Sequence, residues 1–152
     1  MKALNLPDYS FRIQQRDNKK WIFDPMRRKF VVLTPEEWVR QNFVLYLIRV
    51  KGYPQSLIAV EPGLKLGRMP KRADVVIYDS RAVPLAIVEC KAPEVPIDSG
   101  VFDQVVRYNM ALHVKYIMMT NGMVHYCCRL NYDDLSYRFL EDIPTYEHLL
   151  TS

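Results

Sequence analysis

The sequence predicts an α/β fold with a mixed central sheet and a helix on each face. Two short apolar segments, within residues 71–79 and 84–93, are bounded by turn residues and have the pattern of neighbouring strands. A helical pattern precedes them at residues 35–48, and another follows them at residues 99–114. The dipeptide Asn121-Gly122 then separates two further apolar strands, which is the sharpest hairpin signal in the chain.

The first helix has its own start and stop signals. Thr34 can cap it, Pro35 suits the first helical position, and Glu37 lies three residues after the cap. Apolar positions cover much of the circumference of residues 35–48, so this helix should be well buried. It is expected to stop near Gly52.

Several other segments show strand patterns bounded by turn residues. They are residues 21–23, 29–33, 57–61, 116–120, 123–128 and, more loosely, 137–140. A short amphipathic turn over residues 146–150 is expected after them.

The length and composition limit the class of protein. A chain of 152 residues can bury a core, so residues 1–152 are expected to form one domain, with 1–20 as an N-terminal extension or edge segment and about 24–131 as the motif-bearing core. Twenty-one Lys and Arg against 17 Asp and Glu give a net charge of +4, which permits a polyanionic partner without requiring one. The three cysteines do not form a disulfide framework, so we expect reduced thiols in a cytoplasmic protein. The N-terminus lacks the apolar core of a signal peptide, and no apolar run approaches the length of a membrane span, so no membrane partner is expected.

Charged side chains stand at the ends of the two central strands. Asp74 opens the first strand, and Glu89 and Lys91 close the second. Because strand side chains alternate between faces, Glu89 and Lys91 should point the same way and Cys90 the opposite way. If the turn at residues 79–81 pairs the two strands, Asp74 and Glu89 converge. Such charges at the end of an apolar sheet are costly unless they bind something.

Two carboxylates and the backbone carbonyl of Cys90 would supply hard oxygen ligands, which suit Mg²⁺ or Mn²⁺ rather than zinc. An ion held there can polarise a phosphate oxygen and lower the pKa of a bound water. Lys91 can orient that water or stabilise charge on the phosphate, which is the equipment for phosphodiester hydrolysis. The alternative is a surface salt bridge between Glu89 and Lys91 with Asp74 in a turn, and the short pattern alone favours that alternative. The apolar character of both strands argues against a solvated edge.

A further pair of residues lies in the second predicted helix. Gln104 and Tyr108 are four residues apart and therefore share a helix face. Together with Ala73-Asp74 and Glu89-Cys90-Lys91, they resemble the motifs of the PD-(D/E)xK nuclease superfamily and, within it, the N-terminal nuclease domain of type I restriction enzyme R subunits. The segment Thr34-Pro-Glu-Glu-Trp-Val-Arg-Gln41 is similar to the same family.

This resemblance implies a restriction-endonuclease-like fold and Mg²⁺- or Mn²⁺-dependent cleavage of DNA. Asp74 and Glu89 would be metal ligands, and Lys91 would be the catalytic lysine. Gln104 and Tyr108 would match the pair that positions the cleaved strand and its phosphate.

The resemblance also implies a supporting acidic residue in the first helix. Glu37 would match it, with Glu36 as the rival. Ala73 stands where the superfamily's name has proline, a position that often lacks it. The chain has no G-x-x-x-x-G-K-[ST] loop, so the ATP-driven motor of the full subunit is not implied, and a separate motor or specificity protein would be the partner.

Basic side chains close to the predicted site are candidates for contacts with DNA phosphates. They are Lys65, Arg68, Lys71, Arg72 and, in the second helix, Arg107. The alternative for the four residues before Asp74 is a basic loop that only contacts solvent, and the sequence favours the two interpretations about equally. The alternative for Arg107 is a side chain that faces solvent.

The sequence leaves other functions open. One is a nucleic-acid-binding or assembly module that keeps the fold and cuts nothing alone. Another is a nuclease for RNA. Whether a homodimer forms to cut both strands is equally undecided by the sequence.

Overall fold

The computed structural model describes residues 1–65 and 72–151, apart from the side chains of residues 61–65, 72, 73 and 111. The strands are β1 (Ile13–Arg16), β2 (Lys19–Asp24), β3 (Lys29–Val32), β4 (Ile58–Lys65), β5 (Arg72–Tyr78), β6 (Pro84–Cys90), β7 (Tyr116–Thr120), β8 (His125–Asn131) and β9 (Ser136–Phe139). The helices are α1 (Pro35–Arg49), α2 (Ser99–Asn109) and α3 (Tyr146–Thr151).

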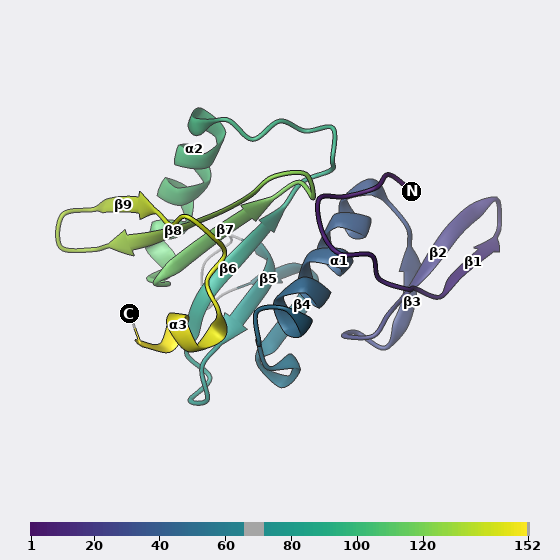
Figure 1. Cartoon of the computed structure of the whole chain (residues 1–152), viewed down its shortest axis with the longest axis horizontal. Helices are drawn as coiled ribbons and strands as arrows, with labels where there is room; N and C mark the ends of the chain where they lie inside the picture. Colours follow the sequence, from purple (N-terminus) through teal and green to yellow (C-terminus); the bar gives the residue numbers. More distant parts are fainter. Residues whose placement is uncertain (66–71, 152) are drawn as a thin grey trace.

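Six strands form a mixed sheet in the order β4-β5-β6-β7-β8-β9 (Figure 1). Strands β6 and β7 are parallel and are connected through α2, whereas all other neighbours in this sheet are antiparallel. The predicted α/β class and mixed sheet are therefore confirmed. Strands β5 and β6 lie inside the sheet, as their apolar character predicted.

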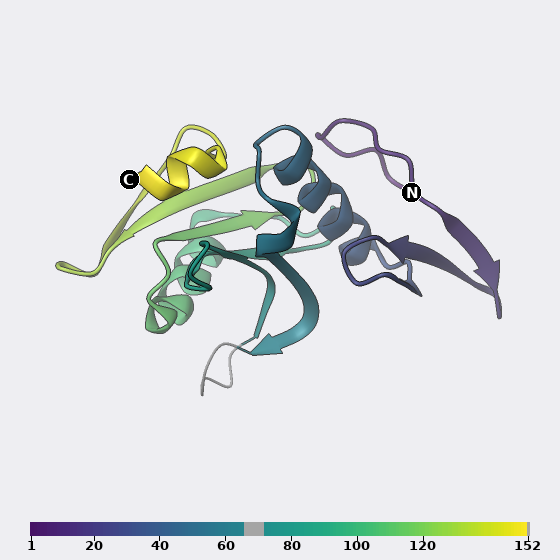
Figure 2. The same ribbon diagram turned by 90° about the horizontal axis from the view of Figure 1, so that it is seen from below.

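Helices cover both faces of this sheet, as predicted (Figure 2). On one face, Phe43 and Leu47 of α1 and Leu149 of α3 belong to one buried cluster. On the other face, Phe102 and Val106 of α2 belong to a second cluster. The side chains of β5 and β6 alternate between the two clusters, which is why both strands read as continuous apolar runs.

A second, three-stranded sheet lies beside α1 and extends away from the rest of the molecule (Figures 1 and 2). We call residues 11–33, which contain β1, β2 and β3, the arm. Strands β2 and β3 match the predicted pair, but β1 was not predicted as a strand. Its turn is formed by Asp17 and Asn18, whose φ angles of 53° and 60° fit residue types that tolerate the left-handed region.

Local side-chain hydrogen bonds decide several element boundaries. The hydroxyl of Thr34 accepts from the N–H of Glu37 at 3.0 Å, which confirms the predicted cap of α1. Helix α2 ends at Asn109 rather than at residue 114, because a 3₁₀ turn and the left-handed His113 (φ 55°) follow it. Strand β8 begins at His125 rather than at residue 123. The carboxamide oxygen of Asn121 accepts from the N–H groups of Met123 and Val124, and these two bonds extend the turn.

Within the described ranges, no helix combines the length and the apolar composition needed to cross a bilayer.

Candidate functional site

The ends of β5 and β6 separate where the charged residues begin. The ladder between these strands runs to the pair Val75 and Val88, and the next positions along the two strands are Asp74 and Glu89. Here the N–H of Cys90 donates to the carboxylate of Asp74 at 2.9 Å. The predicted pairing of the two strands is confirmed, and Asp74 lies directly beyond the last pair of their ladder.

A continuous row of alternating charges leads from the arm to Asp74. At the base of the arm, the carboxylate of Asp24 pairs with Arg27. Arg27 also donates to Glu37 at 2.7 Å, and Arg40 donates to the same carboxylate at 2.5 Å. The other terminal nitrogen of Arg40 donates to Asp74 at 3.1 Å. These five side chains, which we call the charge relay, join the arm, α1 and β5.

Arg40 is the central cation of the charge relay. Its position in α1, three residues after Glu37 and four after Glu36, places all three side chains on one side of the helix. Arg40 is only 5% exposed, and burial alone would lower its pKa. Glu37 and Asp74 raise the pKa of Arg40 instead, so the guanidinium stays charged.

The two acidic candidates of α1 have different surroundings. Glu37 is buried, and its carboxylate accepts from Arg27, Arg40 and the side-chain amide of Gln41. Glu36 is exposed and lies 3.5 Å from Arg40. Partial burial and then the negative charge of Asp74 raise the pKa of Glu36. Glu36 therefore shares an electrostatic environment with Asp74, whereas Glu37 is already compensated by two arginines.

Glu89 and Lys91 are both half-buried at the end of β6. The N–H of Lys91 donates to the carbonyl of Thr120 at 2.8 Å, which fixes the backbone of Lys91 against the end of β7. The positive charge of Lys91 acts on Glu36, where it opposes the rise in pKa. Glu36 of α1 thus interacts electrostatically with both Asp74 and Lys91, and Glu89 lies two residues before Lys91.

The thiol of Cys90 lies on the α1 side of the sheet. Cys90 is 1% exposed and packs in the cluster beneath α1, as the alternation of side chains predicted. Burial, followed by the negative charge of Asp74, raises the pKa of this thiol well above its usual value. Since the thiolate is the reactive form of cysteine, the Cys90 side chain is not a nucleophile in this fold.

The carboxylates at the ends of β5 and β6 would suit a hard cation rather than zinc. In the described part of the chain, no three His, Cys, Asp or Glu side chains stand close enough to form a complete cage. Magnesium is commonly held by one or two carboxylates together with substrate phosphates, so Asp74 and Glu89 fit it better than they fit zinc. The rise in the pKa of Glu36 caused by Asp74 reflects repulsion between carboxylates that a cation would relieve.

The predicted strand-positioning pair lies on α2. Gln104 and Tyr108 are exposed, on the side of the helix opposite the buried Phe102 and Val106. Arg107 is exposed as well and pairs with Asp103 at 2.8 Å. These side chains are therefore accessible to a ligand, and the loop that follows Lys91 connects β6 to α2.

The structure describes none of the side chains of the four basic candidates before Asp74. Lys65 and Arg72 are cross-strand partners at the ends of β4 and β5, and only their backbones are described. Arg68 and Lys71 lie outside the described residues.

Sequence reasoning missed Arg40, Arg27 and Asp24. The signal for Arg40 was available, because a charged residue on a helix that is apolar around most of its circumference must be buried and hence paired. No local pattern pointed to Asp24 and Arg27, since the turn containing them meets α1 only in three dimensions.

Comparisons with known proteins agree with this fold. Residues 35–144 match the family described as Type I restriction enzyme R protein N terminus (HSDR_N). Among solved structures, the chain is similar to a fragment described as an HsdR subunit of a type I restriction enzyme from Vibrio vulnificus YJ016, with a TM-score of 0.56 and 24% identity. That match covers 78% of this chain and 25% of the other chain, and at this identity it shows the fold alone. A comparison with curated proteins gives no match.

The family match covers most of the chain, including α1, the β5–β6 pair and α2. The chain belongs to the family of type I restriction enzyme R protein N termini.

Proposed function

We propose that this chain is a Mg²⁺- or Mn²⁺-dependent endonuclease domain of the PD-(D/E)xK superfamily, with a restriction-endonuclease-like fold, that hydrolyses phosphodiester bonds in DNA. The observation that carries the proposal is the position of Asp74 and Glu89 one step beyond the last pair of the β5–β6 ladder, with Lys91 two residues after Glu89, at the end of two otherwise apolar inner strands. Membership of the restriction-subunit family supports DNA as the substrate.

Asp74 and Glu89 would hold the cation, together with the backbone carbonyl of Cys90, which directly follows Glu89 in the sequence. The cation would supply charge neutralisation at a phosphate and a more acidic bound water. Glu36 replaces Glu37 as the supporting carboxylate in this proposal, because its electrostatic partners are Asp74 and Lys91. Glu37 would act indirectly, by holding Arg40.

Lys91 would stabilise negative charge on the attacked phosphate or orient the water that attacks it. Its backbone is fixed by Thr120, so the ammonium starts from a defined position beside Glu89. Gln104 and Tyr108 would contact the cleaved strand from the exposed side of α2, and Arg107 would add a phosphate contact nearby. Lys65, Arg68, Lys71 and Arg72 would hold phosphates on the other side of Asp74.

The domain would act without reading sequence itself. Residues 1–152 would form one domain, and a separate motor or specificity subunit would deliver the DNA. Cleavage of both strands would then require a homodimer or two successive events, because one site cuts one strand at a time.

A nuclease assay tests the proposal. Purified chain would be incubated with Mg²⁺ or Mn²⁺ and with linear duplex, circular duplex and single-stranded DNA. We expect cleavage by the wild type, and a loss of at least about 100-fold in Lys91→Ala and Glu89→Gln. Lys2→Ala and Glu94→Gln are matched controls, since both side chains are exposed and lie outside the site, and they should cut at the wild-type rate. Equal rates in wild type and Lys91→Ala would contradict the catalytic assignment.

A second function is favoured by the bond between Arg40 and Asp74. That guanidinium occupies one oxygen of the proposed ligand, and such an arrangement suits a module that binds nucleic acid without cutting it. The same assay separates the two functions. DNA binding that is unchanged in Asp74→Ala, combined with no cleavage by the wild type, would support the silent module.

A further inference from the structure

The arm carries most of the basic character of this chain. Residues 11–33 contain seven Lys and Arg and two Asp, which gives a net charge of +5. The remaining residues carry fourteen basic and fifteen acidic side chains, so they are close to neutral. The arm lies before residue 35, where the family match begins, and no part of the proposed catalytic site uses its exposed side chains.

The cations of the arm are available to a ligand. Six of the seven are exposed, namely Arg12, Arg16, Lys19, Lys20, Arg28 and Lys29. Arg27 is the exception, because the charge relay occupies it. Every residue of the arm is described, and none of the six exposed cations forms an ion pair. Their charges are therefore uncompensated within the protein.

One face of the arm arranges cations on aromatic rings. Arg16 lies over the ring of Trp21 at 4.4 Å, and Arg12 lies over the ring of Phe23 at 5.0 Å. Phe30 packs edge-on against Phe23 and approaches both arginines. Stacking of this kind holds a guanidinium plane in place while leaving its N–H groups directed outwards, so less entropy is lost when they bind phosphate.

The remaining exposed cations lie at the two ends of β2. The tip contains Lys19 and Lys20 beside the Asp17-Asn18 turn, and the base contains Arg28 and Lys29. The six residues of β2 span about 20 Å, which is the axial length of about six phosphates along one strand of duplex DNA. The arm thus presents cations along a length comparable to a segment of nucleic-acid backbone.

The base of the arm is rigidly attached. Ile22 is fully buried, Asp24 is 1% exposed, and the charge relay connects Asp24 through α1 to Asp74. The arm is therefore held in a fixed position with respect to the proposed catalytic site. In Figures 1 and 2 it projects on the side of α1 away from β9, so it would extend the DNA-facing surface beyond the central sheet.

We propose that the arm is a nucleic-acid docking surface, which binds the phosphate backbone of duplex DNA through its exposed cations and holds the duplex against the site at Asp74. The inference rests on the proposed function for its choice of DNA. An anionic membrane is the less favoured occupant, because Ile13 is the only large apolar side chain that the arm exposes, whereas interfacial binding needs a continuous apolar face.

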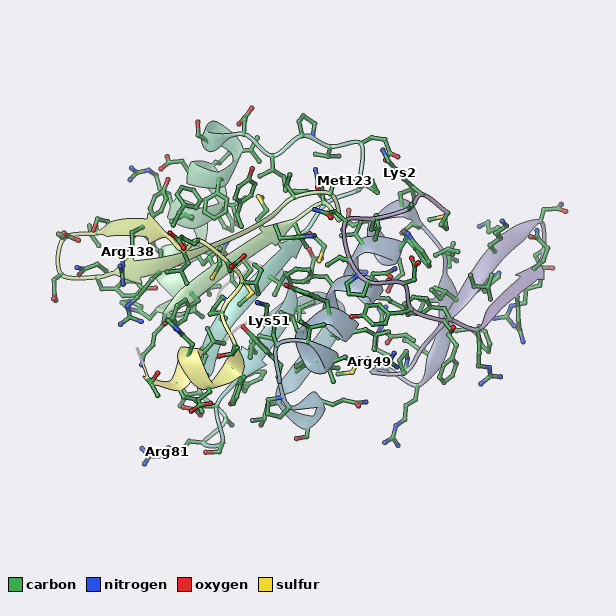
Figure 3. All side chains as sticks on the ribbon, in the orientation of Figure 1. Lys2, Arg49, Lys51, Arg81, Met123 and Arg138 are labelled. Atoms are coloured by element: carbon green, nitrogen blue, oxygen red, sulfur yellow. The ribbon has the colours of Figure 1, made fainter. Side chains whose placement is uncertain are left out.

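Binding is tested apart from cleavage, in EDTA, by the fluorescence anisotropy of a labelled 20-base-pair duplex from about 50 to 300 mM salt. The arm variant is Arg16→Gln/Lys19→Gln/Lys20→Gln. The control variant of equal charge change is Arg81→Gln/Lys115→Gln/Arg138→Gln, whose side chains are exposed. Arg81 and Arg138 lie away from the arm (Figure 3), and Lys115 directly precedes β7 of the central sheet. Circular dichroism melting shows whether both variants keep the fold.

We expect the arm variant to reduce the slope of log affinity against log salt by about 2 to 3, since each lost phosphate contact removes about 0.9. At ~100 mM salt its affinity should fall at least about tenfold, and the control variant should change the slope by less than about 1. Equal losses in both variants, or an unchanged arm variant, would overturn the inference. Tighter arm-dependent binding to phosphatidylserine vesicles than to the duplex would overturn it as well.

A second readout locates the contact. The chain has two tryptophans, so Trp38→Phe leaves Trp21 on the arm as the only one. Arg16 should leave the Trp21 ring when it binds phosphate, and the duplex should therefore change Trp21 emission. In Trp21→Phe, emission from Trp38 should stay constant. A response from Trp38 without one from Trp21 would contradict docking on the arm.

The outcomes separate this inference from the proposed nuclease function. Lys91→Ala should retain the arm-dependent part of the salt slope, because it leaves the six exposed cations of the arm in place. Arm-dependent binding without any cleavage by the wild type would retain the docking surface and reject the nuclease. Cleavage that requires Lys91, together with binding that does not require the arm, would retain the nuclease and reject the docking surface.

Discussion

Arg40 donates one terminal nitrogen to Glu37 at 2.5 Å and the other to Asp74 at 3.1 Å, so a single guanidinium joins the first helix to the strand that carries the proposed metal ligand. The planar fork of arginine makes this double contact possible, and lysine could not reproduce it. The position of Asp74 therefore depends on α1 as well as on its own strand.

Removal of that guanidinium should destabilise the fold strongly. Arg40→Ala would leave Glu37 and Asp74 without their shared cation in a site where Arg40 is 5% exposed. Breaking a buried pair by removing one partner typically costs about 3–5 kcal/mol, and we expect a loss of that size in urea unfolding. Arg107→Ala is the matched control, because its pair with Asp103 is exposed, and the unfolding midpoint should hardly move. Similar midpoints in the two variants would show that the charge relay contributes little.

Glu36 should make stability depend on pH in a defined direction. Burial and Asp74 raise its pKa in the folded state, so ionised Glu36 is less favourable in the folded chain than in the unfolded chain. The penalty is fully present above the folded-state pKa, shrinks as pH falls through that pKa, and is gone below the unfolded-state pKa. Glu36→Gln should thus melt higher than the wild type at pH 7, by on the order of 1 °C because the side chain is half exposed and screened.

That difference should vanish below about pH 4, where Glu36 is protonated in both states. Melting curves of wild type and Glu36→Gln between about pH 3 and pH 8 provide the measurement. A variant less stable than the wild type at pH 7 would mean that the contact between Glu36 and Arg40 outweighs the repulsion from Asp74.

Divalent ions should raise the melting temperature of the wild type. A ligand that binds only the folded state at ten times its dissociation constant adds about 1.4 kcal/mol, which corresponds to roughly 3–5 °C for a chain of this size. We expect this shift with Mn²⁺ or Mg²⁺ at millimolar concentration, and its loss in Asp74→Asn. An identical shift in both proteins would place the bound ion elsewhere.

Patterns along the sequence were sufficient for the sheet and for the pairing of the two strands that carry Asp74 and Glu89. The ladder of these strands runs to Val75 and Val88, and Cys90 is buried, so both features follow from the residue order and one turn. The cap at Thr34 was equally local, because its hydroxyl bonds to an N–H three residues later.

Features that depend on packing between distant segments were not predictable in the same way. Arg40 lies closer to Glu37 than to Glu36, and the Glu37 carboxylate also accepts from Arg27, which reaches it from the arm. Strand β1 has a polar sequence without alternation, and its identity comes from pairing with β2. Its residues therefore read as an extension until the partner strand is known.

The turn between β7 and β8 tests how far the N-terminal segment depends on a glycine. Gly122 has a φ of +85°, and an added Cβ would lie 2.7 Å from a methyl carbon of Leu4 and 3.2 Å from one of Val39. The carbonyl of Gly122 also accepts from the N–H of Asn5 at 2.8 Å. Gly122→Ala would combine backbone strain with displacement of Leu4, and we expect it to cost about 1–3 kcal/mol.

Urea unfolding of Gly122→Ala measures that cost, and limited proteolysis should detect earlier cleavage within residues 1–10 as Leu4 loses its position. Gly100→Ala is the control, because Gly100 lies in the first turn of α2 without a positive φ and its added Cβ would meet only Asp98, at 3.4 Å. That substitution should be neutral or stabilise by about 0.4–1 kcal/mol, since it restricts the unfolded chain. If Gly122→Ala were as stable as Gly100→Ala, the contact between the N-terminal segment and this turn would not determine the position of Leu4.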